Sequence, residues 1–415
     1  MKETKFKQTD IGLIPEDWEI VDISSVVDNC CYGVGAEAVK YNGEVKYLRI
    51  TDIDDESHAF VPKPLASPSF FDDDYFARKG DLFVARTGAS VGKSYLYKEC
   101  DGKLVYAGFL IKIHISNADP YYVFLNTLTK YYSNWILSES ARTGQPGINA
   151  QQLKSFVFPI PPTIEEQERI ANALSQVDEL LAALDEQIEK KKLIKQGTMQ
   201  QLLTGKIRLK GFTGEWKTVK LGEIGNTFNG LSGKSAVDFG TGNAKYVTFL
   251  NVLNNPIIDT SILENVNINL GEKQNAVHKG DLFFNTSSET PEEVGICAVI
   301  LEEIENLYLN SFCFGFRLFD ENVDGKYLAF YFRSKAGRDL MTTLAQGATR
   351  YNLSKSAFDK SEITIPSTLA EQQTIAGILS AMDEEIQALQ EERDKYALVK
   401  QGMMQQLLTG KIRLN

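Results

Sequence analysis

Apolar residues recur at alternating spacings of four and three in two long stretches of the chain. The first stretch follows a proline-rich break at 159–162, and its apolar positions are Ile170, Leu174, Val177, Leu181, Leu184 and Ile188. The second follows Pro366, and its positions are Ile375, Leu379, Met382, Ile386 and Leu389. This heptad spacing is typical of an amphipathic helix that packs against a second helix. It predicts two helices of about 40 residues, each roughly 60 Å long at 1.5 Å per residue.

Both predicted helices carry start and stop signals. A threonine followed three residues later by a glutamate predicts a capping box at each start, from Thr163 with Glu166 and from Thr368 with Glu371. Gly205 and Gly410 follow the last apolar residues, where a helix commonly ends in a left-handed glycine. The boundaries of the two helices are therefore predicted from local chemistry as well as from periodicity.

The chain contains an internal repeat. The segment MQQLLTGKIRL occurs at 199–209 and again at 404–414, an offset of 205 residues (404 − 199). At this offset more than half of the positions from 164 to 209 are identical, and fainter echoes such as KGDLF at 79–83 and 279–283 lie upstream. A repeat this long indicates two copies of one large module. We therefore expect globular domains at 1–155 and 211–362, with helical regions at 156–210 and 363–415.

The globular parts combine short β-type runs with helical patches. The runs include YLRI, DLFVA, GFLIKIHI, KYVTFLNV and FCFGFRLF, and the helical patches follow Pro120 and span Lys326–Arg338. This mixture predicts α+β domains with antiparallel or mixed sheets. We expect the two helices to pair as an antiparallel coiled coil with a pseudo-twofold relation, although packing of each helix on its own domain is the alternative.

Composition narrows the protein class. With 415 residues and 43% hydrophobic content, the chain can bury two sizeable cores. It has no apolar run long enough to span a membrane and no secretory leader, so we expect a cytoplasmic protein with no membrane association. Neither the five cysteines nor the three histidines have the spacing of a metal site, and we expect no metal and no cofactor.

One stretch, from Thr87 to Ser94, resembles a phosphate-binding loop. The GxxxxGK[ST] motif needs a glycine where Thr87 stands, and the segment leads into a strand-like Tyr-Leu-Tyr run instead of a helix. The corresponding segment of the second half, at 285–289, has no glycine-lysine pair. A P-loop nucleotide hydrolase is therefore only an alternative interpretation.

The repeated tails are more nearly identical than a coiled-coil seam requires. Such strict identity favours two copies of one partner protein that bind equivalent surfaces, whereas recent duplication is the simpler alternative. Gly197 and Gly402 support close approach of a partner, because a glycine inside a helix costs roughly 1 kcal/mol relative to alanine. The predicted partner-binding residues are Lys195, Gln196, Gly197, Gln201, Leu202 and Leu203, with Lys400, Gln401, Gly402, Gln406, Leu407 and Leu408.

Taken together, four motifs resemble one known family. IGLIPEDWEI near the start, KGDLF followed by RTG, the PP-EEQ-RIA entry to a long helix, and LLTGKIRL after each helix resemble the specificity subunit of a type I restriction-modification system, over nearly the whole chain. The resemblance implies two target-recognition domains, each reading half of a bipartite, asymmetric site in double-stranded DNA. It also implies helices that fix the gap, two copies of an adenine-N6 methyltransferase subunit as partners, and restriction subunits. The chain itself would not be an enzyme, and it carries no (D/N)PP(Y/F) tetrapeptide.

Charge is unusual for a DNA-binding chain, because the net charge is −11. Local basic clusters offset this, with Arg78, Lys79, Arg86, Lys93, Lys98 and Arg142 in one half and Lys335, Arg338, Arg350 and Lys355 in the other. Arginine suits guanine, and asparagine or glutamine suits adenine, in the major groove. The predicted DNA-binding residues are Arg86, Thr87, Ser90, Lys93, Arg142, Gln145 and Asn149, then Asn285, Ser287, Ser288, Lys335, Arg350, Tyr351 and Asn352. A non-catalytic coiled-coil scaffold without DNA readout is the remaining alternative.

Overall fold

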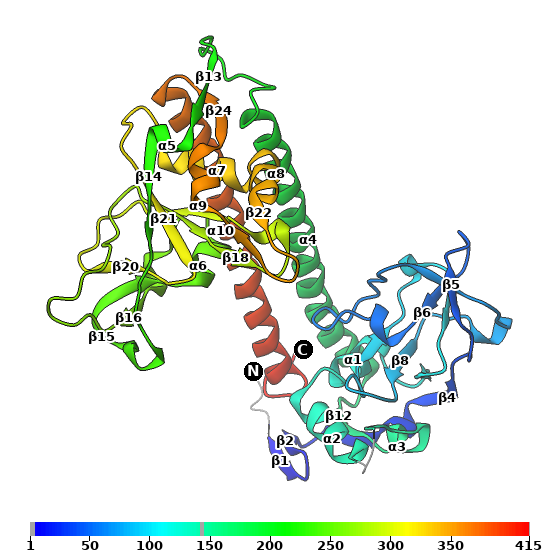
Figure 1. The fold of residues 1–415 in the computed structure, drawn as a ribbon. Helices are drawn as coiled ribbons and strands as arrows, with labels where there is room; N and C mark the ends of the chain where they lie inside the picture. The colour runs from blue at the N-terminus through cyan, green and yellow to red at the C-terminus, as the bar shows by residue number, and fades with distance from the viewer. Residues whose placement is uncertain (1–4, 142–144, 415) are drawn as a thin grey trace. The chain divides into compact units, whose positions relative to one another are not determined.

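A computed structural model describes residues 5–141 and 145–414, and the chain forms two compact units (Figure 1). The first unit contains residues up to Ala183 together with 392–415, and the second spans Leu184–Glu391. Two long helices, α4 (Ile164–Leu202) and α10 (Leu369–Leu407), each contribute one half to each unit. Each unit therefore combines one globular part with the halves of both helices.

A four-stranded antiparallel sheet forms the centre of each unit. In the first unit the strand order is β4 (Val27–Tyr32), β11 (Leu110–Ile115), β8 (Asp81–Ala85) and β9 (Ser94–Leu96). In the second it is β14 (Gly225–Asn229), β21 (Cys313–Leu318), β17 (Leu282–Asn285) and β19 (Cys297–Val299). The two sheets have the same topology, because corresponding strands occupy corresponding places.

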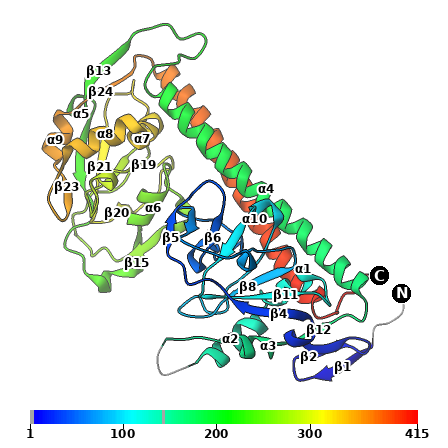
Figure 2. The same ribbon diagram turned by 90° about the vertical axis from the view of Figure 1, so that its right-hand side faces the viewer.

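The smaller elements also correspond. A two-stranded ladder leads into each long helix, from β3 (Glu19–Asp22) with β12 (Val157–Ile160) and from β13 (Trp216–Lys220) with β24 (Glu362–Pro366). A parallel pair adds β6 (Lys46–Leu48) to β10 (Leu104–Tyr106), and β15 (Phe239–Val247) to β20 (Leu307–Leu309). The short helices are α1 (Pro120–Asn126), α2 (Lys130–Ser140) and α3 (Ala150–Lys154) in the first unit (Figure 2), with α7 (Gly325–Arg333), α8 (Lys335–Leu344) and α9 (Lys355–Lys360) in the second.

Other elements belong to one unit alone. The first unit has the hairpin β1 (Phe6–Thr9) with β2 (Gly12–Pro15) and the pair β5 (Ala38–Lys40) with β7 (Ala66–Pro68). The second has α5 (Leu221–Ile224), α6 (Phe249–Asn254), β16 (Glu264–Val266), β18 (Ser287–Ser288), β22 (Ala345–Gln346) and β23 (Tyr351–Leu353). The two units therefore share the four-stranded sheet, the ladder and the parallel pair, and they differ in these additional elements.

The predicted mixture of strands and helices is present, but two of the β-type runs, YLRI and KYVTFLNV, are only partly strand. The DLFVA run forms β8, and the patch after Pro120 forms α1. The KYVTFLNV run is only partly strand, because β15 ends at Val247 and α6 begins at Phe249. Thr248 causes the change, since its side chain accepts a hydrogen bond from the Asn251 amide at 3.2 Å and caps the helix.

The long helices have the predicted length and ends. Each has 39 residues, which is about 58 Å at 1.5 Å per residue. Gly205 and Gly410 have φ values of +69° and +66°, in the left-handed region expected at a helix end. Thr163 accepts a hydrogen bond from the Glu166 amide at 3.3 Å, but the Glu166 carboxylate bonds to Arg413 and does not complete the capping box.

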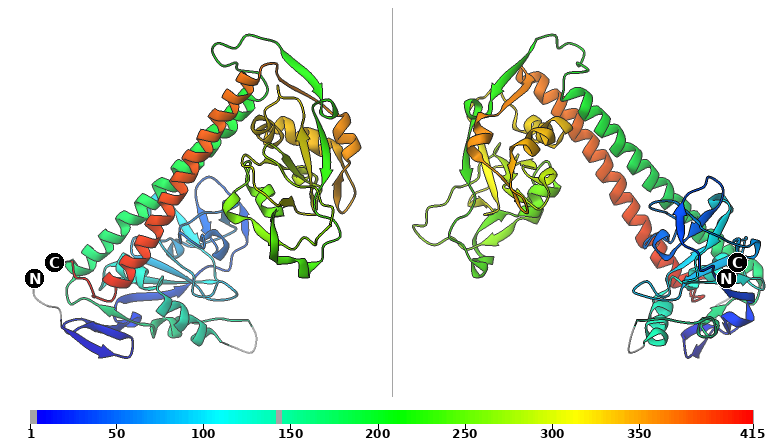
Figure 3. Two further views of the ribbon diagram at one scale, coloured as in Figure 1. Left: turned by 90° about the vertical axis from the view of Figure 1, so that its left-hand side faces the viewer. Right: turned by 45° about the vertical axis from the view of Figure 1, so that its right-hand side comes forward.

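Within each unit the two helix halves lie side by side (Figure 3). In the first unit Lys400 forms an ion pair with Asp178 at 2.5 Å. In the second unit Lys195 forms an ion pair with Asp383. At the repeat offset of 205 residues, Lys195 corresponds to Lys400 and Asp383 corresponds to Asp178. Each pair joins the N-terminal half of one helix to the C-terminal half of the other. Seam residues such as Leu174 and Leu379, both 0% exposed, are buried in the cores of their units.

Candidate nucleic-acid interface and partner-docking faces

In the first unit two distant segments meet beyond the end of β8. The Arg86 amide donates to the Phe109 carbonyl at 3.0 Å, and the Arg86 carbonyl accepts from the Ile148 amide at 2.9 Å. Thr87 forms a β-bridge with Gly147. The segments 86–93 and 145–149, which were both predicted to contact DNA, therefore lie next to each other.

The second unit builds the same junction from different residues. The Thr286 amide donates to the Phe312 carbonyl at 2.9 Å, and the Thr286 carbonyl accepts from the Leu353 amide at 2.9 Å. β18 pairs with β23, so that Ser287 faces Asn352 and Ser288 faces Tyr351. The predicted sites at 285–288 and 350–352 are thus brought together.

Several predicted side chains remain accessible at these junctions. Gln145, Asn149, Arg350 and Asn352 are exposed. Asn149 also caps α3, because its side chain accepts from the Gln152 amide at 2.9 Å. The Arg350 guanidinium donates to the Ser287 hydroxyl at 3.1 and 3.2 Å, which holds both side chains at one place on the surface.

Arg86 is half-buried, and its guanidinium carbon lies 4.6 Å from the centre of the Tyr32 ring. Stacking on an aromatic face holds the guanidinium plane in a fixed orientation. Among the described residues its Nε has no hydrogen-bond partner. The group is therefore a positioned cation with an unused donor.

Asn285 has a structural position and is not available to read a base. Its side chain is buried, at 1% exposure. The amide nitrogen donates to the Glu293 carbonyl at 2.7 Å, and the amide oxygen accepts from the Ile296 amide at 2.6 Å. Its hydrogen-bonding groups shape the loop that carries Ser287 and Ser288.

Two predicted lysines are engaged elsewhere. Lys93 forms an ion pair with Asp55 at 2.5 Å, and Lys335 forms one with Asp339 at 3.0 Å along α8. Ser90 lies in a tight turn in which its carbonyl accepts from the Lys93 amide at 3.0 Å. Arg142 lies outside the described residues. The P-loop alternative is contradicted, because Lys93 is bound to a carboxylate and the loop continues into strand β9, as the sequence indicated.

Arg338, from the predicted basic cluster, supports a loop in the second unit. Its guanidinium donates to the carbonyls of Glu292 at 2.8 Å and Gly295 at 2.9 Å, and burial lowers its pKa. Lys355 bonds instead to Asn229 and lies 5.6 Å from the centre of the Phe314 ring. Lys355 therefore lies beside the end of β14, whereas Arg338 is committed to the fold.

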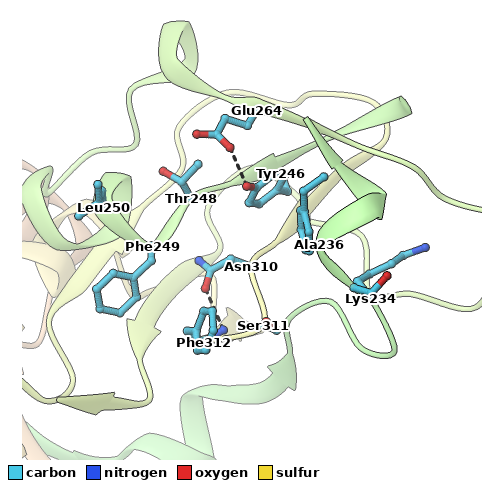
Figure 4. A pocket seen from close by; sticks show the side chains of 12 residues that line it. Lys234, Ala236, Tyr246, Thr248, Phe249, Leu250, Glu264, Asn310, Ser311 and Phe312 are labelled. Atoms are coloured by element: carbon cyan, nitrogen blue, oxygen red, sulfur yellow. Dashed lines mark hydrogen bonds between the residues drawn. The ribbon is translucent and has the colours of Figure 1, made fainter. Parts of the chain in front are cut away.

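An open cavity of about 570 Å³ adjoins Phe312 in the second unit (Figure 4). Tyr246 and Phe249 line it, and the Tyr246 hydroxyl donates to Glu264 at 2.7 Å. Burial and this bond raise the pKa of Tyr246 to about 12, so Tyr246 does not change charge near neutral pH. No cluster of three or more potential metal ligands occurs within residues 5–141 and 145–414.

The repeated tails contribute to the cores of the units. Leu202, Leu203, Leu407 and Leu408, all predicted to bind a partner, are 6%, 1%, 4% and 2% exposed. Leu202 and Leu203 pack with the second unit's core, and Leu407 and Leu408 with the first unit's core. Their identity in the two copies has an internal reason, and their side chains are not free to contact a partner.

The arginine of each tail also makes equivalent internal contacts. Arg413 bonds to both Glu166 oxygens at 2.5 and 2.7 Å, and Arg208 to both Glu371 oxygens at 2.7 and 2.8 Å. Each guanidinium carbon lies 5.8 Å from the centre of a tryptophan ring, which is Trp18 for Arg413 and Trp216 for Arg208. The left-handed conformation of Gly205 and Gly410 lets each tail turn toward the first residues of the other long helix.

A second set of repeated residues lacks such an internal reason. A Cβ added at Gly197 or Gly402 would meet nothing within 4 Å. One helical turn earlier Leu193 and Leu398 are 67% and 69% exposed. Six predicted partner-binding residues lie on the same two helix segments. Gln196, Gln201 and Gln401 are exposed, and Gln406, Lys195 and Lys400 are half-buried. The two lysines differ from the rest because they are held in internal ion pairs.

Ile194 and Val399 extend the same surface, at 46% and 44% exposure. We define the two matched faces as residues 193–201 of α4 and 398–406 of α10. Leu193 and Leu398 were not among the predicted partner-binding residues, although their identity outside the heptad seam was an available signal.

Comparison with known proteins identifies the family. A profile described as "Type I restriction modification DNA specificity domain" matches residues 15–192 and 213–395. The putative type I restriction enzyme MjaX specificity subunit of Methanocaldococcus jannaschii is 27% identical over 441 residues, covering 100% of this chain and 98% of the relative. The MjaVIII specificity subunit of the same organism is 25% identical over 448 residues, covering 100% and 97%.

Solved structures share the fold. The type I restriction-modification S subunit from M. genitalium superposes with a TM-score of 0.61 at 16% identity, covering 97% of this chain and 98% of that one. A chain from a structure titled for complex assembly and conformational transition of the type I R-M system gives 0.57 at 16% identity, covering 96% and 99%. No helix among the described residues is both long and apolar enough to cross a bilayer. Since the family profile matches both halves of the chain, the protein belongs to the specificity subunits of type I restriction-modification systems, the non-catalytic DNA-recognition subunits of these complexes.

Proposed function

We propose that each globular part reads one half of a bipartite, asymmetric site in double-stranded DNA. The observation that carries this proposal is the pair of equivalent junctions beyond β8 and β17. Their backbone hydrogen bonds correspond, whereas the side chains they present are Thr87 and Gln145 in one unit and Ser287 and Arg350 in the other. A constant framework with different polar groups suits two readers of different base sequences.

The two long helices pair as an antiparallel coiled coil and set the gap between the half-sites. Ion pairs within each unit support this arrangement, because Lys400–Asp178 and Lys195–Asp383 are related by the 205-residue offset. Arg413–Glu166 and Arg208–Glu371 are related in the same way. Exchanging the helices reproduces the same contacts, which is the property of a pseudo-twofold axis.

Two copies of an adenine-N6 methyltransferase subunit bind the matched faces at 193–201 and 398–406. Exposed leucines and a helix glycine with open space around it favour close packing against another helix. Identical partners require equivalent surfaces, and these positions are equivalent in the repeat. Restriction subunits then complete the complex, which acts on DNA in the cytoplasm.

The acidic chain depends on these partners for affinity. With a net charge of −11, the isolated protein repels the phosphate backbone, and only local cations such as Arg86 and Arg350 offset this. Base contacts then supply selectivity, while the methyltransferase subunits supply most phosphate contacts. The isolated chain should therefore bind DNA weakly at physiological salt.

The test is to purify the complex with its methyltransferase subunit and let it methylate a library of random-sequence DNA. Sequencing of the methylated molecules should give one motif with two specified parts and a fixed gap. Methylation without any sequence preference, by a complex that contains this chain, would contradict DNA readout. That outcome would favour the protein scaffold, whose globular parts bind something other than DNA.

A further inference from the structure

Each unit presents one exposed phenylalanine at an equivalent place. Phe109 is 64% exposed and immediately precedes β11, and Phe312 is 60% exposed and immediately precedes β21. β11 and β21 are the corresponding inner strands of the two sheets. A single exposed phenylalanine is ordinary, but the same exposure at the same structural position in two diverged domains indicates a shared use.

The backbone that carries each phenylalanine is fixed from two sides. On one side, a backbone hydrogen bond comes from the residue that follows β8 or β17. The Arg86 amide donates to the Phe109 carbonyl at 3.0 Å, and the Thr286 amide donates to the Phe312 carbonyl at 2.9 Å. On the other side a glycine touches the same turn. A Cβ at Gly33 would overlap the Ala107 carbonyl, so the backbone just before Phe109 packs directly against this glycine.

The second unit repeats the glycine contact, because a Cβ at Gly230 would overlap the Asn310 carbonyl. The Asn310 side chain also accepts a hydrogen bond from the Phe312 amide at 2.9 Å (Figure 4). The exposed ring is thus not the result of a loose loop. It lies at the rim of the open cavity that Tyr246 and Phe249 also line.

A cation lies beside each turn. In the first unit Arg86 stacks on Tyr32, the residue before Gly33. In the second unit Lys355 bonds to Asn229, the residue before Gly230. Each phenylalanine is therefore bonded through its backbone to the proposed base-reading loop and has a basic group nearby, a combination that suits a nucleic acid better than an apolar protein surface.

We propose that Phe109 and Phe312 are a matched pair of base contacts, one for each half-site, that make apolar contact with DNA bases. The inference rests on the proposed function, because it names further residues for the same DNA-reading surface. Phenylalanine recognises either the methyl group of thymine in the major groove or the face of an unstacked base. In both cases it adds selectivity without neutralising a phosphate.

The experiment measures DNA binding by the complex with its methyltransferase subunits. The probes are a duplex that carries the motif selected by the wild-type complex and a duplex of scrambled sequence, each at several salt concentrations. The variants are Phe109→Ala and Phe312→Ala. Phe319→Ala is the matched control for Phe312, since Phe319 is 55% exposed and follows the opposite end of the same strand. Phe70→Ala, at 61% exposure, is the control in the first unit.

Each test variant should lose about tenfold in affinity for the motif, keep its affinity for scrambled DNA, and keep the slope of log affinity against log salt. In methylation of a random library, Phe109→Ala should relax one half-site and Phe312→Ala the other. Replacing thymines by deoxyuridine, one at a time, should reproduce the loss if the contact is with a methyl group. Retention of affinity by every such duplex would assign the contact to a base face.

Three results would overturn the inference: wild-type affinity in both test variants, an equal loss on scrambled DNA, or an equal loss in the Phe70 and Phe319 controls. Thermal unfolding of each variant separates lost contact from lost folding, and Phe109→Leu, which keeps an apolar side chain, should recover part of the affinity. If the wild-type complex shows no sequence preference, the proposed function itself fails. Wild-type preference with unaffected phenylalanine variants would reject only this inference.

Discussion

Breaking the ion pair between Arg413 and Glu166 from one side should destabilise the first unit strongly. Glu166 is 4% exposed, and the Arg413 side chain is 17% exposed. Replacing Arg413 with methionine keeps most of the packing volume but leaves a buried carboxylate without its cation. Because an uncompensated charge in a protein interior is costly, the variant should unfold more easily.

The expected loss is about 3 kcal/mol. Breaking a buried pair by removing one partner typically costs about 3–5 kcal/mol. The lower end applies here because solvent reaches part of Arg413. Its second partner, Asp17, is 53% exposed and adds at most about 1 kcal/mol. An exposed pair on α4, Lys192 with Glu189 at 46% and 67% exposure, is the control, and Lys192→Met should cost less than about 0.5 kcal/mol.

Urea unfolding followed by tryptophan fluorescence can report on one unit at a time. The chain has three tryptophans, and two of them lie against the tail arginines, Trp18 in the first unit and Trp216 in the second. In a Trp135→Phe and Trp216→Phe background, the signal from Trp18 should shift to lower urea in Arg413→Met. In a Trp18→Phe and Trp135→Phe background, Trp216 should show little change.

A double variant tests the physical reason for the loss. Combining Glu166→Gln with Arg413→Met removes both charges, so most of the lost stability should return. A loss below about 1 kcal/mol in Arg413→Met would show that the buried Glu166 carboxylate does not depend on its cation. So would a double variant whose loss equals the sum of the two single losses.

Three further predictions concern the DNA-reading and docking surfaces. Gly197→Ala should raise helix stability by roughly 0.5–1 kcal/mol, whereas Gly197→Leu should weaken methyltransferase binding, measured by native mass spectrometry. The control is Gly377→Leu, which should leave methyltransferase binding unchanged. Gly377 is a helix glycine with equally open space around it, but the other copy has no glycine at the equivalent position. Arg350→Ala should cost about 1–3 kcal/mol at one base position, measured as relaxed selectivity in library methylation, and a uniform loss on all sequences would assign Arg350 to phosphate. Asn285→Ala should lower the unfolding free energy by about 1–3 kcal/mol, because it leaves the Ile296 amide and the Glu293 carbonyl unpaired, and an unchanged urea midpoint would contradict its structural role.

The long helices were predictable because their signals are local. Heptad spacing, the capping threonines and the left-handed glycines at 205 and 410 all act within a few residues, and the helix lengths agree with them. Fold class followed from runs such as DLFVA in the same way. The FLNV segment was misassigned because the Thr248 cap outweighed the β-type composition of its neighbours.

The details of the site depended on contacts between distant residues. Nothing in the sequence near Arg86 shows that it pairs with Ile148, and nothing near Asn285 shows that its side chain is buried under the 287–296 loop. The leucines at 202 and 203 were assigned to a partner because identity alone does not distinguish internal from external contacts. Their burial resolves this, while Leu193 remains exposed.

The most direct test of DNA-sequence selection by this chain is to map N6-methyladenine across the genome of cells that contain the methyltransferase subunit, with this chain present, deleted and restored. We expect a bipartite asymmetric motif that disappears on deletion and returns on restoration, with its two halves altered separately by substitutions in the two units. A methylation pattern that is the same with and without the chain, while the methyltransferase is active, would contradict the claim that this chain selects the DNA sequence.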